Sequence, residues 1–155
     1  MPDNNTTPQK TTGSGAKVSI STDGTTFQEF GSVSSVSMPT MSRGTVDVTD
    51  LNSYEDNDKF KEYLADFVEG GDLVTNGFFL AGDEGQAAAE TAFYGDNPVW
   101  IRIVLPAKIG KTFTAKGIPT SYQPLGDIDP SNGIGFSFTV KVTAKPTLAA
   151  TTQGG

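Results

Sequence analysis

The sequence predicts a mainly β protein, an antiparallel β sandwich or half-barrel with one α-helix packed against it. Short runs of alternating apolar and polar residues recur along the chain, and turn residues separate them. Only one segment carries helix signals at both of its ends. The length of 155 residues fits a single domain with a single hydrophobic core.

The first half of the chain supplies five of the expected strands. Their runs occupy residues 16–21, 26–30, 33–38, 44–49 and 72–80. Asp23 and Gly24, between the first two runs, form a dipeptide that is typical of a hairpin turn. In the fourth run the alternation predicts that Val46 and Val48 face inward. Gly77 in the fifth run indicates a bulge or the close approach of another backbone.

The single helix is expected at Asp83–Tyr94. Asp83 can cap the first turn, and Gln86 stands three residues later, as in a capping box. Gly95 offers a C-terminal stop. A small apolar face is formed by Ala89, Ala92 and Phe93.

The remaining strands are expected at residues 98–106, 111–118 and 133–144. The first of these is apolar on both faces and is predicted to be buried. The last has the most regular alternation in the chain. Its inward-facing residues are predicted to be Ile134, Phe136, Phe138, Val140 and Val142.

The composition argues against most enzyme classes. The sequence contains no His and no Cys, so it lacks the usual general base at neutral pH, a thiolate nucleophile and the commonest metal ligands. Its net charge of −7 disfavours a phosphate-binding surface for nucleic acid. No signal peptide or membrane-spanning segment is predicted. The chain is expected to be soluble and to be made inside the cell.

Two acidic loops could hold a hard cation. Residues 127–133, "DIDPSNG", approach the spacing of a calcium loop, but the Gly comes one position late and no Glu closes the loop. A turn between two strands explains them without a metal. In "YEDNDKF", Glu55, Asp56 and Asp58 lie close together, but a solvated loop is favoured because no partner group is visible. The sequence therefore predicts no catalytic residue, no metal and no cofactor.

Charge is distributed unevenly along the chain. Residues 41–96 hold thirteen of the eighteen acids and three of the eleven bases, whereas the C-terminal strands carry most of the lysines. A subunit with one acidic and one basic region is suited to head-to-tail association with its own copies. The alternative is that the net charge only keeps the domain soluble.

The sequence also carries a family resemblance. The stretch "GSVSSVSMPTMSRGTVDVTDLNS", followed by "KFKEYLADFVEGGDLVTNGFFL", resembles the major tail tube proteins of long-tailed, non-contractile (lambda-like) bacteriophages. The resemblance covers about residues 16–145, and one departure from the family pattern is Glu69, where many relatives have Asp. The matching residues are Ser42 and Arg43, Thr45 to Thr49, Leu51 to Ser53, Lys61 to Leu64 and Glu69 to Asp72.

The resemblance implies a structural virion protein with the tail-tube fold, in which six subunits form a ring, build a lumen β-barrel from their strands, and stack into a DNA-conducting tube. Residues 16–145 would be the tube domain, with an inter-ring arm at 40–72 and flexible tails at 1–15 and 146–155. The implied partners are the protein itself, a tape measure protein, and tail terminator and tip proteins. The protein would be made in the host bacterial cytoplasm and reside in the virion tail, with no membrane insertion.

Particular residues are expected to serve this assembly. The acids proposed to face the lumen, where DNA passes without specific binding, are Glu29, Asp47 and Asp72. An apolar stripe at helical spacing is expected to contact the next ring, unless it folds back on its own domain. Its members are Phe60, Tyr63, Leu64 and Phe67.

Other functions compete with the tube. A phage decoration protein or a glycan-binding β-sandwich module would share the β-rich composition, but would be a monomer or trimer with exposed aromatics. Type VI secretion tubes share the implied fold in outline, but their subunits lack the "VDVTDLNS" run.

Overall fold

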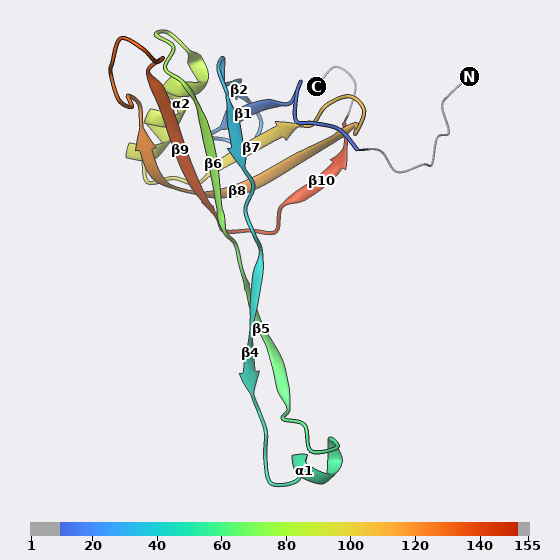
Figure 1. Ribbon diagram of the computed structural model, residues 1–155. Coiled ribbons are helices and arrows are strands. Elements are labelled where there is room, and N and C mark those ends of the chain that lie inside the picture. The colour runs from blue at the N-terminus through green and yellow to red at the C-terminus, as the bar shows by residue number, and fades with distance from the viewer. Residues whose placement is uncertain (1–9, 152–155) are drawn as a thin grey trace, which may run out of the picture.

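The computed structural model describes residues 10–151, which form a curled sheet with a helix against it and a ribbon projecting from it (Figure 1). The sheet contains β1 (Lys17–Ser21), β2 (Gln28–Glu29), β3 (Ser35–Ser37), β6 (Asp72–Phe78), β7 (Val99–Val104), β8 (Lys111–Gln123), β9 (Gly135–Val142) and β10 (Thr147–Ala150). The ribbon contains β4 (Ser42–Asp47) and β5 (Tyr63–Glu69), with the short helix α1 (Ser53–Asp56) between them. The helix against the sheet is α2 (Glu84–Tyr94).

The sheet runs in the order β2-β1-β7-β8-β9-β6-β3, and β10 also pairs with β8. Every pairing is antiparallel. The long strand β8 can pair with both β10 and β9 because it uses a different stretch for each. It pairs with β10 over Lys111–Thr114 and with β9 over Gly117–Gln123. The predicted mainly β, antiparallel architecture is confirmed.

The core lies between the inner face of the sheet and α2. Strands β7 and β9 alternate between buried and half-buried residues, as their sequences predict. Phe136, Phe138, Val140 and Val142 are buried, and Ile134 is half-buried just before β9. Burying each large apolar side chain contributes about 1.5–3 kcal/mol. The alternation of apolar and polar residues therefore predicts both that the segment is a strand and which of its faces is buried.

The first hairpin forms as expected. Ser19 pairs with Glu29 and Ile20 with Gln28, across a turn in which Gly24 has φ 84°. Asp23 organises this turn, because its Oδ1 accepts hydrogen bonds from the backbone N–H groups of Thr25 and Thr26. The expected close approach at Gly77 is also confirmed, since a Cβ there would overlap the carbonyl oxygen of Ser32.

The start of α2 differs in part from the predicted capping box. Asp83 caps the helix, its Oδ2 accepting from the Gln86 backbone N–H at 3.1 Å. The Gln86 side chain does not return the bond. It is buried, donates to the Phe78 carbonyl at 2.9 Å and accepts from the Leu80 N–H. The reciprocal bond of the capping box, from the Gln86 side chain to the Asp83 backbone, does not form. The Gln86 side chain instead satisfies backbone groups at and just after the end of β6.

The end of α2 also differs from the expected mechanism. The helix stops at Gly95, but Gly95 has φ −91°, and the left-handed conformation falls on Asp96 at φ 58°. Asp is one of the few non-glycine types that adopt this conformation readily.

The predicted tails are described in part. Residues 1–9 and 152–155 lie outside the described residues. Residues 10–15 contain no helix or strand. In the predicted C-terminal tail, Thr147–Ala150 form β10 and pair with Lys111–Thr114 of β8, which corrects the expectation for that stretch. Within residues 10–151, no helix has the length and apolar character needed to cross a membrane.

Candidate functional site

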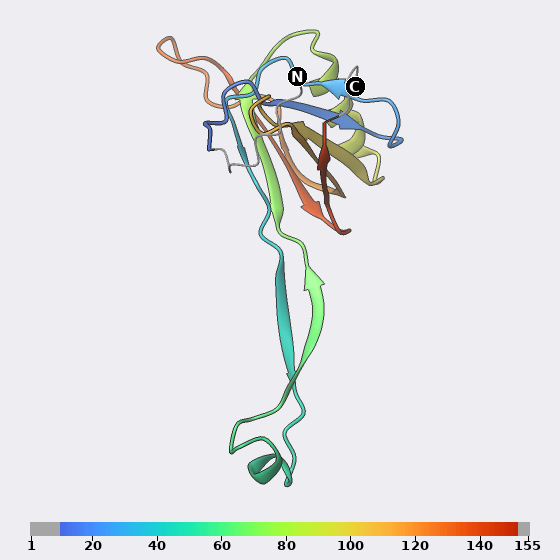
Figure 2. The same ribbon diagram turned by 90° about the vertical axis from the view of Figure 1, so that its right-hand side faces the viewer.

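Residues 41–70 form a projection from the β domain, called the arm below (Figure 1). Figure 2 shows it standing clear of the domain in the turned view as well. Within residues 10–151, strands β4 and β5 pair only with each other, and every residue in them is exposed. The arm coincides with the excursion predicted at residues 40–72.

Cross-strand pairing holds the arm extended. Val46 lies opposite Leu64 and Thr45 opposite Ala65. Beyond the strands, the Val48 N–H donates to the Glu62 carbonyl at 2.9 Å, so the ladder continues toward the tip. β-Branched residues favour this pleated pairing. The prediction that Val46 and Val48 face inward is wrong, because no second layer from the described part of the chain covers either face of the ribbon, and the two side chains are 46% and 38% exposed.

The apolar stripe is not helical. Tyr63, Leu64 and Phe67 belong to β5, and Phe60 precedes that strand. The helical spacing is overridden because pairing with β4 satisfies the backbone of this segment. The alternative that the stripe folds back on its own domain is also wrong, since all four side chains are exposed, Phe67 to 90%.

The arm carries half of the large hydrophobic side chains that the described residues expose. Leu51 is 98% exposed and Phe60 73%. Exposed apolar groups concentrated in this way mark interaction surfaces. The members on the arm are Met41, Val46, Val48, Leu51, Tyr54, Phe60, Tyr63, Leu64, Phe67 and Val68.

The tip of the arm is a locally built turn around α1. Ser53 is its buried residue, and its Oγ accepts from the Asp50 N–H at 3.0 Å. Asp50 Oδ1 in turn accepts from the N–H groups of Asn52 and Ser53. These bonds give the tip a defined shape although it buries no core.

The three tip acids, Glu55, Asp56 and Asp58, are exposed. Asp58 and Lys59 adopt left-handed conformations, with φ 51° and 72°. No group of three or more acidic side chains within residues 10–151 is arranged to hold a metal ion. The acids instead give the tip a negative surface.

The base of the arm is fixed to β9. A Cβ at Gly70 would overlap the carbonyl oxygen of Val142, so only glycine permits this close approach. Lys141 Nζ donates to the Gly70 carbonyl at 3.0 Å and lies 3.5 Å from the Glu69 carboxylate. The Val142 N–H donates to the Gly71 carbonyl at 3.0 Å. This anchor was not predicted from the sequence, although the Gly-Gly pair directly before a strand is a usable signal.

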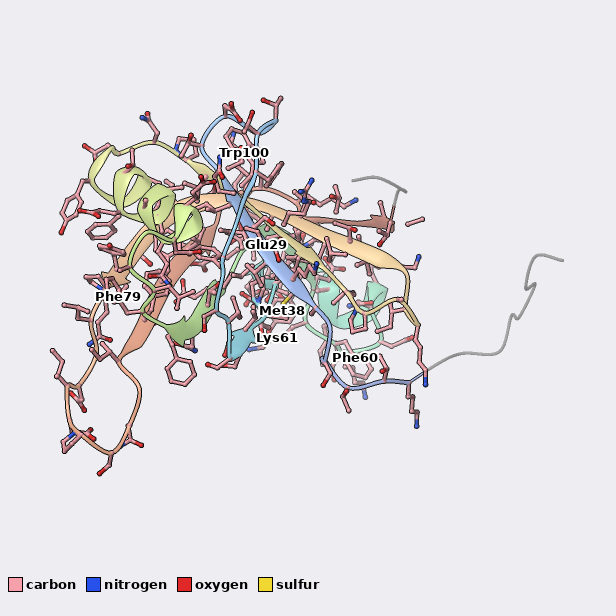
Figure 3. All side chains as sticks on the ribbon, turned by 90° about the horizontal axis from the view of Figure 1, so that it is seen from above. Glu29, Met38, Phe60, Lys61, Phe79 and Trp100 are labelled. Carbon is pink, nitrogen blue, oxygen red and sulfur yellow. The ribbon has the colours of Figure 1, made fainter. Side chains whose placement is uncertain are left out.

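The three candidate lumen acids lie on separate elements. Glu29 lies on β2 and Asp72 begins β6, opposite Lys141. Asp47 lies on the arm, where hydrogen bonds from the Thr49 hydroxyl and backbone N–H lower the pKa of its carboxyl. Figure 3, which looks down on the domain, labels Glu29 on the domain and Phe60 and Lys61 on the arm beneath it. The fold of one subunit does not gather these acids into one site.

The acidic loop at residues 127–133 is a turn, as the sequence favours. Asp129 Oδ1 accepts from the backbone N–H groups of Ser131 at 2.8 Å and Asn132 at 3.0 Å. These bonds and the Asn132 side chain lower the pKa of Asp129. The carboxylate is thus already occupied by the turn that it stabilises.

No protein family and no curated protein matches the sequence. Solved structures do match the fold. A chain of the tail of an empty gene transfer agent particle, refined with C6 symmetry, aligns with a TM-score of 0.67 at 14% identity, over 91% of this chain and 100% of that one.

Two other assemblies contain similar chains. The SPP1 tail tube protein aligns with a TM-score of 0.60 at 14% identity, over 87% of this chain and 76% of that one. A chain from the sheath-tube complex of an extracellular contractile injection system aligns with a TM-score of 0.61 at 15% identity, over 87% and 88%. At these identities the likeness establishes the fold, which this chain shares with proteins of tail and tube assemblies.

Proposed function

We propose that this chain is the tail tube subunit of a long-tailed, non-contractile bacteriophage, and that it self-assembles into stacked hexameric rings. The tube conducts the genome into the host cell. The observation that carries the proposal is the arm, which exposes ten large hydrophobic side chains on a fold shared with tail and tube proteins. The protein acts mechanically, without catalysis or a cofactor.

The arm supports self-assembly on energetic grounds. An isolated two-stranded hairpin is at best marginally stable in water, and this one buries little apolar surface of its own. Contact with a neighbouring ring would remove its apolar side chains from water, at about 25 cal/mol per Å². The arm is therefore an inter-ring contact.

Ring formation is supported by the sheet. Its terminal strands are β2 and β3, whose outer edges make no strand pairing within residues 10–151. Closure of a ring covers such edges against neighbouring copies. Six subunits per ring are proposed because the similar gene transfer agent tail has C6 symmetry.

Passage of DNA is supported by charge. A net charge of −7 and a pI near 4.4 give a subunit that repels phosphate, so a lumen lined by its acids does not retain DNA. The partners at the two tube ends are a terminator and a tip protein, and a tape measure protein fills the lumen before ejection.

The non-contractile assignment is the finer part of the proposal. It is supported by the "SRGTVDVTDLNS" resemblance and by the similarity to the SPP1 tail tube. Chains of contractile systems share the fold, so the fold does not distinguish a contractile from a non-contractile tail. The presence or absence of a sheath around the tube distinguishes them. We expect virions whose tails lack one.

Electron microscopy of the purified protein over a range of concentration and salt tests the proposal. Hollow tubes with sixfold rings would support it. A protein that stays monomeric under every condition would contradict it, and discrete globules that bind glycans would favour a decoration or glycan-binding module.

A further inference from the structure

A groove of about 700 Å³ lies at the base of the arm, and the proposed function leaves it without a role. One wall comes from the arm and the other from the end of β9 and the segment leading to β10. The residues that matter here are Met41, Arg43, Val68, Lys141, Lys145 and Pro146. The groove thus combines apolar walls with basic side chains.

The positive charge of the groove is only partly balanced within the subunit. Three basic side chains line it against one acid, Glu69. The single ion pair among residues 10–151 joins Lys141 to Glu69, so within the described residues Arg43 and Lys145 have no acidic partner. An anionic surface would complete the groove.

The tip of the arm has the complementary character. It presents Glu55, Asp56 and Asp58 together with two exposed apolar side chains, Leu51 at 98% and Tyr54 at 64%. A surface that is both acidic and apolar matches a groove that is both basic and apolar. Figure 1 shows α1 at the end of the ribbon farthest from the domain, whereas the residues that line the groove belong to the base of the arm and the end of β9, so the tip does not reach the groove of its own subunit.

The reach of the arm suits a second copy. Residues 42–49 extend from the base toward the tip, and eight extended residues span about 26 Å at about 3.3 Å each. Strand β9, which also has eight residues, gives the domain a comparable length. Copies stacked along the arm at a spacing near one domain length therefore bring the tip of one subunit to the groove of the next.

We infer that the acidic tip of each arm docks into the basic groove at the base of the arm of a copy in the adjacent ring. This inference rests on the proposed function, because it requires stacked copies. The inference adds the surface that receives the arm tip. It also makes stacking directional, because the tip and the groove lie at different ends of the arm. Each subunit offers a tip at one end and a groove at the arm base.

Cross-linking tests the contact in assembled protein, and the absence of Cys gives a clean background. Asn52→Cys marks the tip, where the native side chain makes no capping bond, and Ala144→Cys marks the groove. The two single variants are mixed, assembled and treated with a short bismaleimide. We expect covalent dimers in the mixture, at least tenfold above either variant alone.

A matched pair provides the control. Asn52→Cys mixed with Ser131→Cys, which lies in the exposed loop before β9, should give no dimer above background. Assembled tubes without the tip-to-groove dimer would overturn the docking while leaving tube formation intact. Absence of tubes in the unmodified protein would instead contradict the proposed function.

Charge reversal provides a second, independent test. Glu55→Lys with Asp56→Lys in the tip, or Arg43→Glu with Lys145→Glu in the groove, should each raise the concentration needed for tubes roughly tenfold. Mixing the two double variants should restore assembly, since each reversed tip then meets a reversed groove. Asp127→Lys, in an exposed loop, is the matched control. Failure of the mixture to recover, with both variants folded by circular dichroism, would overturn the inference.

Discussion

Lys141 and Gly70 join the arm to the domain: the Lys141 ammonium on β9 donates to the Gly70 carbonyl at 3.0 Å. The same ammonium lies 3.5 Å from the Glu69 carboxylate at the end of β5. The direction in which the arm leaves the domain is therefore set by a side chain of the sheet as well as by the backbone.

Replacing Lys141 should loosen the base of the arm without unfolding the domain. In Lys141→Met we expect faster amide hydrogen exchange around Gly70 and Gly71, and a loss of stability of at most about 1 kcal/mol, because the ion pair is largely exposed. Lys111→Met, at the exposed start of β8, is the control. Unchanged exchange at the base would show that the glycine contacts alone hold the arm.

The arm should change its protection on assembly. Amides from Leu51 to Glu69 are expected to exchange rapidly in the free subunit, because no other element of residues 10–151 covers the exposed hairpin, and slowly in the tube. Hydrogen exchange read by mass spectrometry measures both states. The amides of β9, buried in the sheet, should be protected in each. Equal protection of the arm in the two states would place the inter-ring contact elsewhere.

Truncating two arm side chains should separate folding from stacking. Phe60→Ala with Leu64→Ala removes groups that are 73% and 60% exposed, so thermal stability should change by no more than about 0.5 kcal/mol per site. Stacking should fail, because in the proposed tube these side chains supply contact area between rings. The contrast is Leu73→Ala, 1% exposed, which should cost about 2–5 kcal/mol. Normal tubes from the double variant would refute the role of this pair.

Reversing the proposed lumen acids should slow DNA ejection. With Glu29→Lys, Asp47→Lys and Asp72→Lys, tubes are expected to form, while added positive charge retains phosphate and the delay shrinks as salt rises. Ejection is followed by fluorescence of released DNA. Each position is tested alone because the three acids lie on different elements. A position whose reversal leaves ejection unchanged would be assigned to the outer wall.

The first hairpin should contribute a pH-dependent stability. Hydrogen bonds from the backbone N–H groups of Thr26 and Thr25 and from the Ser21 hydroxyl hold the pKa of Asp23 well below its ordinary value. Since the folded pKa is depressed, the contribution is present above the ordinary pKa near 3.8 and is lost as pH falls toward the folded value. Asp23→Ala should therefore lower the melting temperature at pH 7 and converge on the wild type in strong acid. A difference independent of pH would exclude this cause.

Local signals in the sequence predicted much of the domain. The cap at Asp83 and the alternation through Phe136 and Val140 succeeded because neighbouring residues determine them. Strand β10 was missed because its structure depends on β8, more than thirty residues away in sequence. On the arm, the spacing of Phe60, Leu64 and Phe67 fits a helix, and only pairing with β4 selects the strand.

The functional surface was harder to predict for the same reason. The sequence located an acidic excursion with unpartnered apolar residues, and in the structure this excursion projects from the domain with both of its strands exposed. The groove combines Arg43 and Val68 from the arm with Lys145 from beyond β9, so no single stretch of sequence contains it. When long-range strand pairing brings side chains together, no local pattern in the sequence predicts the resulting surface.

The join at Gly70 and Gly71 also fixes how the subunit bears load. Strand β5 leads through these two residues directly into β6, which pairs with β9 at seven positions from Asp72 to Phe78. Ladder hydrogen bonds run perpendicular to the strands, so tension applied at the tip and transmitted along β6 loads them together, in shear. Rupture then requires many bonds to break at once, whereas a force across the sheet would open them one at a time. In the proposed tube, a filament linked through such arms would therefore resist stretching along its axis.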